Sequence, residues 1–473
     1  MSQLTSKYPA ATGRRPRVAV VGGGFAGINA ALALSKLPVD VTVIDRRNHH
    51  IFQPLLYQVA LAVLSPAQIA QPIRTILRRN PNTEVLMDEV VGIDTGTRQL
   101  KLSSGTIFTY DYLVLGTGAT HSYFGHDDWA KYAPGLKSVE DATEIRRQVL
   151  LAFELAERHM LEHGWYPPLN FVIIGGGPTG VELAGAVSDI ARLYMRHDFR
   201  HIDPAKARVL LIEGSPRILA TFPPDLSAMA LKQLEEIGVE VWNGKQVTEV
   251  GAGYVRVGDQ QIEATVILWA AGVATSPLGR MLGAPVDKRG AVIVDHQLNP
   301  EGLPEVFVCG DLAHFEQDGR QIPGVAQPAM QMGRHAAKVI ASDLKGKIRP
   351  DFRYWDKGDM ATIGRLAAVA KIEWPFKAHW GGFMAWVTWL IVHIYFLIGF
   401  RNRLTIFSTW AWTYFTFADS ARLITGDQRL TGWEEATGGS AHDPVNPVPG
   451  QVPGHPPPHD SAEVLAGEAA KRS

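Results

Sequence analysis

The sequence predicts an α/β fold of two doubly wound units, the second inserted into the first, followed by an apolar C-terminal segment. Three observations support this. A strand, a glycine-rich turn, a helix and a second strand follow one another from Arg17, the same order returns from Asn170, and an uncharged apolar stretch occupies residues 380–400. A chain of 473 residues is long enough for two or three domains, each with its own core.

Composition narrows the possible chemistry. The single cysteine, Cys309, excludes an intramolecular disulfide framework, a cysteine-ligated iron–sulfur cluster and a two-cysteine redox centre, and its apolar strand places it in the core. Lys and Arg total 46 against 47 Asp and Glu, so charge offers no argument for nucleic acid, and no such partner is expected. The histidines lack paired ligand spacing, and no metal is expected.

The N-terminal residues 1–16 are polar and lack the apolar run of a secretory signal. We expect them to be disordered and the protein to function on the cytoplasmic side. The segment VAVVGGGFAG then forms the first strand and glycine turn, INAALALSKL the helix, and VDVTVIDRR the second strand.

The first glycine turn has the spacing of a dinucleotide-binding fingerprint. Gly22 permits the tight turn, Gly24 lets a pyrophosphate approach the backbone, and Gly27 lets the helix pack closely on the strand. Asp45 closes the second strand, where its carboxylate can accept hydrogen bonds from an adenosine ribose. The alternative is a glycine turn that binds no nucleotide.

The second turn repeats the pattern with Gly175, Gly177, Pro178, Thr179 and Gly180. The expected ribose acid, Glu213, lies 33 residues beyond Gly180, because RLYMRHDFRHIDPAKA extends the helix and adds a loop. A carboxylate at this strand end favours NADH over NADPH, since a 2′-phosphate would meet like charge. Arg217, four residues later, weakens that preference, and Glu213 could instead be structural.

Two such sites in one chain indicate a flavin-dependent NAD(P)H oxidoreductase, in which one site holds a flavin and the other presents a nicotinamide. Disulfide reductases share this layout but need paired cysteines. Asp311, after the strand VFVCGD, is placed to accept hydrogen bonds from flavin-chain hydroxyls, or is a plain acid at a helix start. Gln327 and Gln331 share a helix face and could line a quinone slot or face solvent.

Several motifs carry a family resemblance. They are VVGGGFAGINAALAL, VIDRRNHHIFQPLLYQVALAVLSPAQIAQPIR, VIIGGGPTGVELAGAVSDI, VFVCGDLAHF, GVAQPAMQMG and YWDKGDMATIGRLAAVA. Together they resemble type II NADH:quinone oxidoreductase, the single-chain alternative NADH dehydrogenase, over about residues 17–425, and are close to its actinobacterial members. The N-terminal extension and the proline-rich tail depart from the family pattern but touch none of these motifs.

The resemblance implies Rossmann-like domains with non-covalent FAD, NADH as substrate and a quinone as acceptor. It assigns Gly310 and Asp311 to the ribityl chain of FAD, points the helix entered at Ala326 towards the flavin ring, and fits Ala326–Gln331 to the family's AQxAxQ quinone pattern. The expected FAD site also includes Phe25, Ala26, Arg46, Thr117 and Gly118, and the expected NADH site Gly272.

Two further residues are implicated by the same resemblance. Glu182, in the first turn of the second fingerprint's helix, is implied to lie where hydride passes, although favourable helix-dipole placement explains it as well. Lys357 resembles a position near the quinone end of the flavin, but could be a solvated loop lysine.

The expected domain boundaries follow from these motifs. An FAD-binding domain comprises residues 17–140 and 296–345, with the NADH-binding domain at 141–295 between its two parts. Residues 346–430 form a membrane-binding and dimerisation region, and 431–473 a disordered proline-rich tail.

The apolar run at 380–400 is long enough for one membrane span. The family's monotopic members, and tryptophans scattered through 380–412, favour helices that lie on the cytoplasmic face of the plasma membrane and reach its quinone pool. A buried helix in a homodimer is a third possibility. Without a transmembrane array of buried acids, the enzyme is not expected to pump protons.

Two rival functions remain at this stage. Sulfide:quinone oxidoreductase has the same layout but works through several cysteines, and Cys309 stands alone. A flavoprotein that acts as a binding or signalling module would react slowly with NADH.

Overall fold

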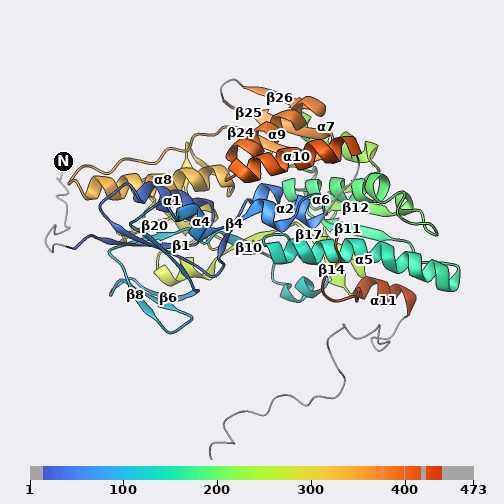
Figure 1. Ribbon diagram of the computed structural model, residues 1–473, viewed down its shortest axis with the longest axis horizontal. Helices are drawn as coiled ribbons and strands as arrows, with labels where there is room; N and C mark the ends of the chain where they lie inside the picture. The colour runs from blue at the N-terminus through green and yellow to red at the C-terminus, as the bar shows by residue number, and fades with distance from the viewer. Residues whose placement is uncertain (1–13, 375–376, 399, 417–421, 439–473) are drawn as a thin grey trace, which may run out of the picture. The chain divides into compact units, whose positions relative to one another are not determined.

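The computed structural model describes residues 14–374, 377–398, 400–416 and 422–438. They lie in a compact unit that ends at Thr437, and only Gly438 is described of the second unit, Gly438–Ser473. The unit contains two parallel sheets flanked by helices, with a smaller antiparallel sheet towards its C-terminal end (Figure 1).

The first parallel sheet has the strand order β20-β9-β1-β2-β5. Its members are β1 (Arg17–Val21), β2 (Asp40–Asp45), β5 (Thr83–Met87), β9 (Tyr112–Leu115) and β20 (Val306–Val308). Buried valine, leucine and isoleucine side chains fill these strands, as expected for a sheet covered on both faces. Helices α1 (Phe25–Leu34) and α8 (Ala326–Asp343) pack against each other beside it.

The second parallel sheet has the order β13-β12-β11-β17. It comprises β11 (Asn170–Ile174), β12 (Arg208–Glu213), β13 (Val239–Asn243) and β17 (Val266–Trp269), with helices α5 (Val139–His163), α6 (Pro178–Asp189) and α7 (Pro224–Glu236) around it. All its strands precede β20 of the first sheet in the chain. The half of the fold built on the second parallel sheet is therefore inserted into the half built on the first, as predicted.

In each half of the fold an antiparallel three-stranded meander precedes a strand of the parallel sheet, β9 in the first half and β17 in the second. In the first unit these strands are β6 (Val90–Asp94), β7 (Gln99–Leu102) and β8 (Ile107–Thr109). In the second they are β14 (Val247–Gly251), β15 (Tyr254–Val257) and β16 (Gln260–Glu263). The two halves are joined by an antiparallel strand pair, β10 (Ala119–His121) with β18 (Val273–Thr275). The two halves are thus built on one plan.

Shorter elements complete the nucleotide-binding part. They are β3 (His49–Ile51), α2 (Leu56–Ala60), α3 (Pro66–Ile69), β4 (Ala70–Pro72), α4 (Ile73–Leu77), β19 (Val292–Ile293), β21 (Ala313–His314), β22 (Glu316–Gln317) and β23 (Arg320–Gln321). Helix α6 continues into one π-helical turn at Ile190–Tyr194, which is the helix extension expected before β12. Cys309 is fully buried, as expected.

The C-terminal region begins with a sheet of β24 (Gly358–Ile363), β25 (Ala367–Ile372) and β26 (Ala378–Gly381). Helices α9 (Phe383–Phe396) and α10 (Phe400–Thr416) follow. The apolar run 380–400 is therefore divided between a strand end, a helix and the start of a second helix. In the part of the chain that the structure describes, no helix combines the length and apolarity needed to cross a bilayer.

Parts of α9 and α10 belong to the core. Trp389, Leu397, Ile406 and Trp410 are at most 8% exposed and share one apolar cluster with α2, α5 and α6. The region predicted to bind the membrane therefore also contributes side chains to the core. Their burial means that the C-terminal helices also stabilise the nucleotide-binding part.

Parts of both predicted disordered segments are ordered in the structure, namely residues 14–16 and 431–437. Residues 431–437 form helix α11 (Thr431–Thr437), because Trp433 is buried and Arg147 donates hydrogen bonds of 2.8 Å to the carbonyls of Asp427 and Arg429. At the other end, Arg14 pairs with Asp111 at 3.0 Å. Residues 1–13 and 439–473 of the predicted disordered segments lie outside the described residues.

Candidate functional site

The first glycine turn connects β1 to α1 at the carboxyl end of the parallel sheet. Gly22 has a φ of +101°, which side chains rarely adopt. A Cβ on Gly27 would lie 1.8 Å from the Gly22 carbonyl oxygen, so the helix reaches the strand only with glycine there. A Cβ on Gly24 would meet protein no closer than 3.8 Å. The middle glycine is thus open on the side where a pyrophosphate would approach.

The second turn, between β11 and α6, has the same geometry. Gly175 has a φ of +110°, and a Cβ on Gly180 would lie 1.7 Å from the Gly175 carbonyl oxygen. Around Gly177 no protein atom lies within 4 Å of an added Cβ. Pro178 and Thr179 open the helix, and the N–H groups of its first turn, from Thr179 onward, have no carbonyl partner within the helix and can bind an anion.

The two predicted ribose acids hold their glycine turns. Asp45 accepts hydrogen bonds from the Gly23 N–H at 2.5 Å and the Arg47 N–H at 2.7 Å. Glu213 likewise accepts from the Gly176 N–H at 2.5 Å and the Ser215 N–H at 2.6 Å. Because a carboxylate offers about four lone-pair sites, each acid keeps acceptor capacity for a ribose.

Arg217 does not take the role that the sequence left open for it, namely binding the 2′-phosphate of NADPH. Its guanidinium donates to the carbonyls of Leu219, Ala220 and Phe222 at 2.7–3.3 Å. These bonds hold the arginine within its own loop, which favours the NADH preference expected from Glu213.

The remaining predicted FAD residues surround the start of α1. Thr117 and Gly118 follow β9, and Gly310 and Asp311 follow β20, the two strands paired beside β1. An added Cβ on Gly310 would lie 3.3 Å from Ala329 and 3.7 Å from Ala26, so the starts of α1 and α8 meet here. Phe25 and Ala326 are the first residues of these helices.

Arg46 differs from the rest of this group. Its side chain is 60% exposed and lies 3.7 Å from Glu89, so the structure shows it in a surface ion pair beside the turn.

Gly272, which is predicted to bind NADH, follows β17. A Cβ added to it would lie 2.7 Å from the Phe124 ring. The structure therefore places it at the corresponding edge of the second sheet.

The predicted FAD site fits a dinucleotide on two independent observations. The open middle glycine lies at the N-terminus of a ten-residue helix. In addition, Thr117 Oγ1 and the Nε2 of His50 are buried without a hydrogen-bond partner in the described structure. Buried polar atoms of this kind normally have partners, and a bound dinucleotide carries many donors and acceptors.

Gln327 and Gln331 lie together, as predicted, but both contact one loop. Gln327 Nε2 donates to the Gly358 carbonyl at 3.0 Å, and Gln331 exchanges two 3.0 Å hydrogen bonds with the backbone of Trp355. Gln327 Oε1 is buried with no partner among the described residues. One amide N–H of each glutamine stays available for a carbonyl.

Lys357 lies in the same loop as these backbone partners. It is half-buried, with its ammonium 5.1 Å from the Trp355 ring centre and 5.3 Å from that of Phe396 on α9. The structure thus brings the three predicted quinone-site residues together, next to the C-terminal end of α9.

Glu182 lies one turn further into α6 than expected, at its fifth residue, so first-turn dipole stabilisation does not explain it. The Thr362 N–H of β24 donates to its carboxylate. Its side chain keeps some accessible surface, yet desolvation by the surrounding protein raises its pKa to about 8, and the Thr362 bond opposes this only in part. A carboxyl of this kind can hold and release a proton near neutral pH.

Sequence reasoning missed a buried polar cluster next to Glu182. Tyr57 and Gln58 on α2, Thr362 on β24 and Trp410 on α10 are each at most 8% exposed and hydrogen-bonded to one another. The available signal was the pair of polar residues inside the apolar run PLLYQVALAV. No spacing rule connects it to residues more than three hundred positions away.

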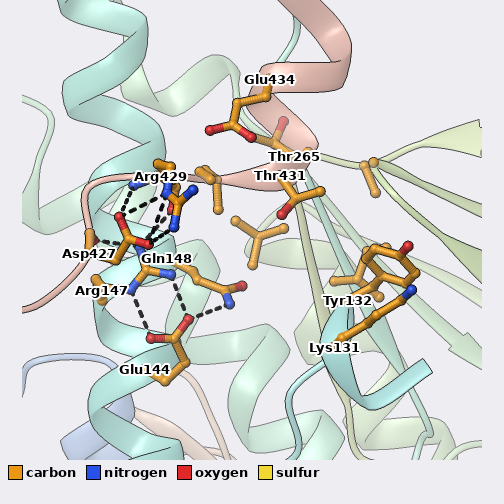
Figure 2. Close-up of a pocket in the computed structure, with 16 residues that line it drawn as sticks. Lys131, Tyr132, Glu144, Arg147, Gln148, Thr265, Asp427, Arg429, Thr431 and Glu434 are labelled. Atoms are coloured by element: carbon orange, nitrogen blue, oxygen red, sulfur yellow. Dashed lines mark hydrogen bonds and ion pairs between the residues drawn. The ribbon is translucent and has the colours of Figure 1, made fainter. Parts of the chain in front are cut away.

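A polar cavity of about 320 Å³ lies apart from both glycine turns, where the segment before α11 passes α5 (Figure 2). It is lined by charged and polar side chains, including Lys131, Tyr132, Glu144, Arg147, Gln148, Thr265, Asp427, Arg429, Thr431 and Glu434. The arginines are already paired with acids of the wall, at 2.6 Å for Arg147 and Glu144. The cavity holds none of the predicted site residues. Among the described residues no group of His, Cys, Asp and Glu is arranged to hold a metal ion.

Comparison with known proteins agrees with this arrangement. Residues 16–333 match the pyridine nucleotide-disulphide oxidoreductase family. The type II NADH:quinone oxidoreductase NdhA of Mycobacterium tuberculosis is 41% identical over 440 residues, 89% of this chain and 92% of its own. Ndh of the same organism, also a type II NADH:quinone oxidoreductase, is 40% identical over 430 residues, 88% and 91% of the two chains.

Solved structures show the same fold at lower identity. NDH2 from Plasmodium falciparum, in complex with NADH, has a TM-score of 0.76 at 20% identity and covers 87% of this chain and all of that one. The sulfide:quinone oxidoreductase of Aquifex aeolicus has a TM-score of 0.66 at 18% identity, with 85% and 96% covered. Since two relatives at 40% identity or more align along nearly their whole length, the chain belongs to the type II NADH:quinone oxidoreductases, within the pyridine nucleotide-disulphide oxidoreductase family.

Proposed function

We propose that this type II NADH:quinone oxidoreductase uses non-covalent FAD at the Gly22–Gly27 turn and NADH at the Gly175–Gly180 turn, and reduces a membrane quinone without pumping protons. The overall reaction is NADH + H⁺ + quinone → NAD⁺ + quinol. When bound, the flavin supplies the capacity to accept a hydride and to release two electrons. Proton donation, orientation of the quinone and selection of the nucleotide are assigned to residues of the chain.

One observation carries this proposal: strand β24 contacts both α8, which holds the proposed quinone-site glutamines, and α6, which follows the proposed NADH turn. Its first residue, Gly358, accepts a hydrogen bond from Gln327 on α8, and Thr362, four residues later, donates to Glu182 on α6. Four residues of strand span about 13 Å. The helix of the first nucleotide unit and the helix of the second are thus held at neighbouring points of one strand.

The proton balance gives Glu182 its proposed role. Quinol formation consumes one proton beyond the hydride, and a group with a pKa of about 8 can donate it and be reprotonated at neutral pH. Gln327, Gln331 and Lys357 would orient the quinone carbonyl through their free N–H groups. Glu213 would select NADH by accepting from the 2′-hydroxyl and repelling a 2′-phosphate.

The apolar surface of α9 and α10 supports the proposed attachment to a membrane, which we assign to the cytoplasmic face of the plasma membrane on the family resemblance. Large side chains on these helices are 51–68% exposed, namely Phe383, Met384, Ile391, Tyr395, Leu404 and Phe407. Such a surface favours lipid contact and delivery of quinone from the membrane beside Lys357. A homodimer stays part of this proposal, resting on the family resemblance alone.

The sulfide:quinone rival has no counterpart in the site. Cys309 is fully buried in the first sheet, and burial raises the pKa of its thiol, which disfavours the reactive thiolate. Rapid quinone reduction would exclude the signalling alternative.

Stopped-flow kinetics of the Gln331→Ala variant test the proposed assignment of the two half-reactions. Reoxidation of reduced flavin by quinone should slow by about tenfold or more, the loss expected for one or two hydrogen bonds. Flavin reduction by NADH should be nearly unchanged, and Lys338→Ala, an exposed residue of the same helix, should match the wild type in both steps. Impaired reduction with normal reoxidation would overturn the quinone-site assignment.

A further inference from the structure

The buried cluster beside Glu182 forms a continuous hydrogen-bond chain from α10 to β24. Trp410 Nε1 donates to Gln58 Oε1 at 2.8 Å, and Gln58 Nε2 donates to the Tyr57 hydroxyl at 3.0 Å. The Tyr57 hydroxyl lies 2.8 Å from Thr362 Oγ1. The backbone N–H of Thr362 then reaches the Glu182 carboxylate. Four elements, α10, α2, β24 and α6, are linked in this order.

The chain is buried along its whole length, so its geometry is tightly held. Its four side chains are 2–8% exposed, and none of their polar atoms lacks a partner. Hydrogen bonds in such surroundings are stronger than in water, and a partner left unsatisfied there is costly. Removal of one member should therefore disturb its neighbours.

The fold brings Glu182 to Thr362 through a close helix–strand approach. Gly185, one turn after Glu182 on α6, faces the residue that follows β24: an added Cβ would lie 2.5 Å from the Gly364 backbone nitrogen. Only a residue without a side chain allows this spacing. The position of β24, and thus of the Thr362 N–H, sets the surroundings of the carboxylate.

α10 is fixed at the far end of the chain by two consecutive residues. Beside the Trp410 bond, Thr409 Oγ1 accepts from Gln68 Nε2 at 3.0 Å. Leu404 and Phe407 of the same helix are more than half exposed. One helix thus carries both an apolar outer surface and the buried end of the chain.

We propose that Tyr57 is a positioning residue for Glu182, and that the Trp410–Gln58–Tyr57–Thr362 chain makes the protonation of Glu182 depend on how α10 is packed. Tyr57 would act through Thr362 and would touch neither substrate nor cofactor. The link to catalysis rests on the proposed function of Glu182, whereas the link between Tyr57 and the protonation of Glu182 does not.

Charged and titratable groups near this chain lie on several elements. Arg146 of α5 donates to the Val59 carbonyl next to Gln58, and His393 of α9 stacks on Trp389, which contacts Trp410. The Tyr57 phenol, whose pKa burial raises, is affected by Glu182 and by Asp189, both on α6. Asp359 on β24 interacts instead with Asp356, Lys371 and Glu373. The N–H of Thr362 lowers the pKa of Glu182, so a looser Thr362 should raise it further.

The test is an infrared titration of the FAD-loaded enzyme that follows the protonated-carboxyl band lost in Glu182→Gln. In Tyr57→Phe the midpoint of this band should rise by about half to one pH unit, the size of shift expected from one weakened hydrogen bond. Trp410→Phe, which keeps an aromatic ring but lacks the indole N–H, should shift it in the same direction by less. Tyr110→Phe, a buried tyrosine whose hydroxyl has no partner among the described residues, should leave it unchanged.

A double-mutant cycle shows whether Tyr57 acts through Thr362. Thr362→Val retains the backbone N–H but lacks Oγ1, so the double variant with Tyr57→Phe should shift the midpoint no more than either single variant. Additive shifts would overturn this route, and an unchanged midpoint in Tyr57→Phe would overturn the proposal.

The activity profile separates this proposal from the proposed function. The pH dependence of quinone reduction should move with the infrared midpoint in each variant. If Glu182→Gln left that profile unchanged, the catalytic role of Glu182 would fail, while the infrared midpoints would still decide the role of Tyr57.

Discussion

At the residue scale, Asp45 and Glu213 hold the glycine turns to which we assign nucleotide binding, and they are also the acids proposed to bind the ribose. Each ends a strand and accepts two N–H groups, one from its glycine turn and one two residues further along the chain. Charge-assisted bonds of this kind are stronger than neutral ones. A neutral replacement should therefore change both nucleotide preference and the rigidity of the turn.

Glu213→Gln should shift nucleotide preference towards NADPH by about tenfold, measured as the ratio of kcat/KM for NADPH to that for NADH. The variant loses the negative charge that opposes a 2′-phosphate but keeps one carbonyl acceptor for the Gly176 N–H. Arg217→Lys, which alters a side chain bonded only within its own loop, is the control and should keep the wild-type ratio. An unchanged ratio in Glu213→Gln would place the specificity determinant elsewhere.

Glu182 should also affect stability, because its pKa rises from 4.5 to about 8 on folding. Between these values the folded protein holds a proton that the unfolded chain has released, so stability falls as pH rises through this window and stays reduced above it. Glu182→Gln removes this loss. Its Tm relative to the wild type should rise by at least about 2–4 °C between pH ~5 and pH ~9, the shift that roughly 1 kcal/mol produces in a large domain.

Glu236→Gln is the matched control for this measurement, since Glu236 is an exposed glutamate on α7. Its Tm should follow the wild type across the same range. If the difference between Glu182→Gln and the wild type did not depend on pH, the carboxyl would not be desolvated as the structure indicates.

At the element scale, local patterns predicted what local forces determine. The glycine turns, the helices they open and the acids that end the next strands follow from backbone sterics and periodicity, and all are confirmed at Gly22–Asp45 and Gly175–Glu213. The β24–β26 sheet and α11 were not predicted. They depend on contacts between residues distant in sequence, such as Arg147 with the carbonyl of Asp427, which no local pattern reveals.

The candidate site divides in the same way. The glycine turns and the strand-end acids Asp45 and Glu213 were predicted from spacing, whereas the other predicted nucleotide residues and Gln327, Gln331 and Lys357 needed a family resemblance. Their partners in the structure, the backbone of Trp355 and Gly358, could not be foreseen, because a loop's carbonyl directions depend on the strand that follows it.

The contact between α1 and α8 gives the prediction at this scale. An added Cβ on Gly333 would lie 2.1 Å from the Ala26 carbonyl oxygen, so Gly333→Ala must push the two helices apart. Overpacking of this kind costs about 1–3 kcal/mol. Purified Gly333→Ala should retain less FAD, measured by the ratio of flavin to protein absorbance, and have a lower Tm.

Lys338→Ala controls for helix propensity, because Lys338 is an exposed residue five positions further along α8. It should keep wild-type flavin content. Full flavin retention by Gly333→Ala would show that the start of α1 does not depend on this contact.

At the scale of the whole molecule, α9 and α10 contribute both to the core and to the exposed surface. Trp389, Ile406 and Trp410 fill the core, while other side chains of the same helices are exposed. Truncation after Trp374 would therefore remove core residues, and we expect it to lower Tm and flavin content. Membrane attachment has to be tested with substitutions on the exposed side alone.

The variant Met384→Ser/Ile391→Ser/Leu404→Ser removes three side chains that are 59–64% exposed on α9 and α10. Burial of each in lipid is worth about 1.5–3 kcal/mol, so binding to vesicles should weaken by roughly tenfold or more per residue. The core contacts remain, so NADH should still reduce a water-soluble acceptor at the wild-type rate. Met87→Ser/Ile107→Ser/Leu161→Ser, with side chains 52–66% exposed outside α9 and α10, is the matched control and should bind vesicles like the wild type. Equal loss in both triple variants would point to a general decrease in surface hydrophobicity, and undiminished binding by the first would place the membrane contact on another surface.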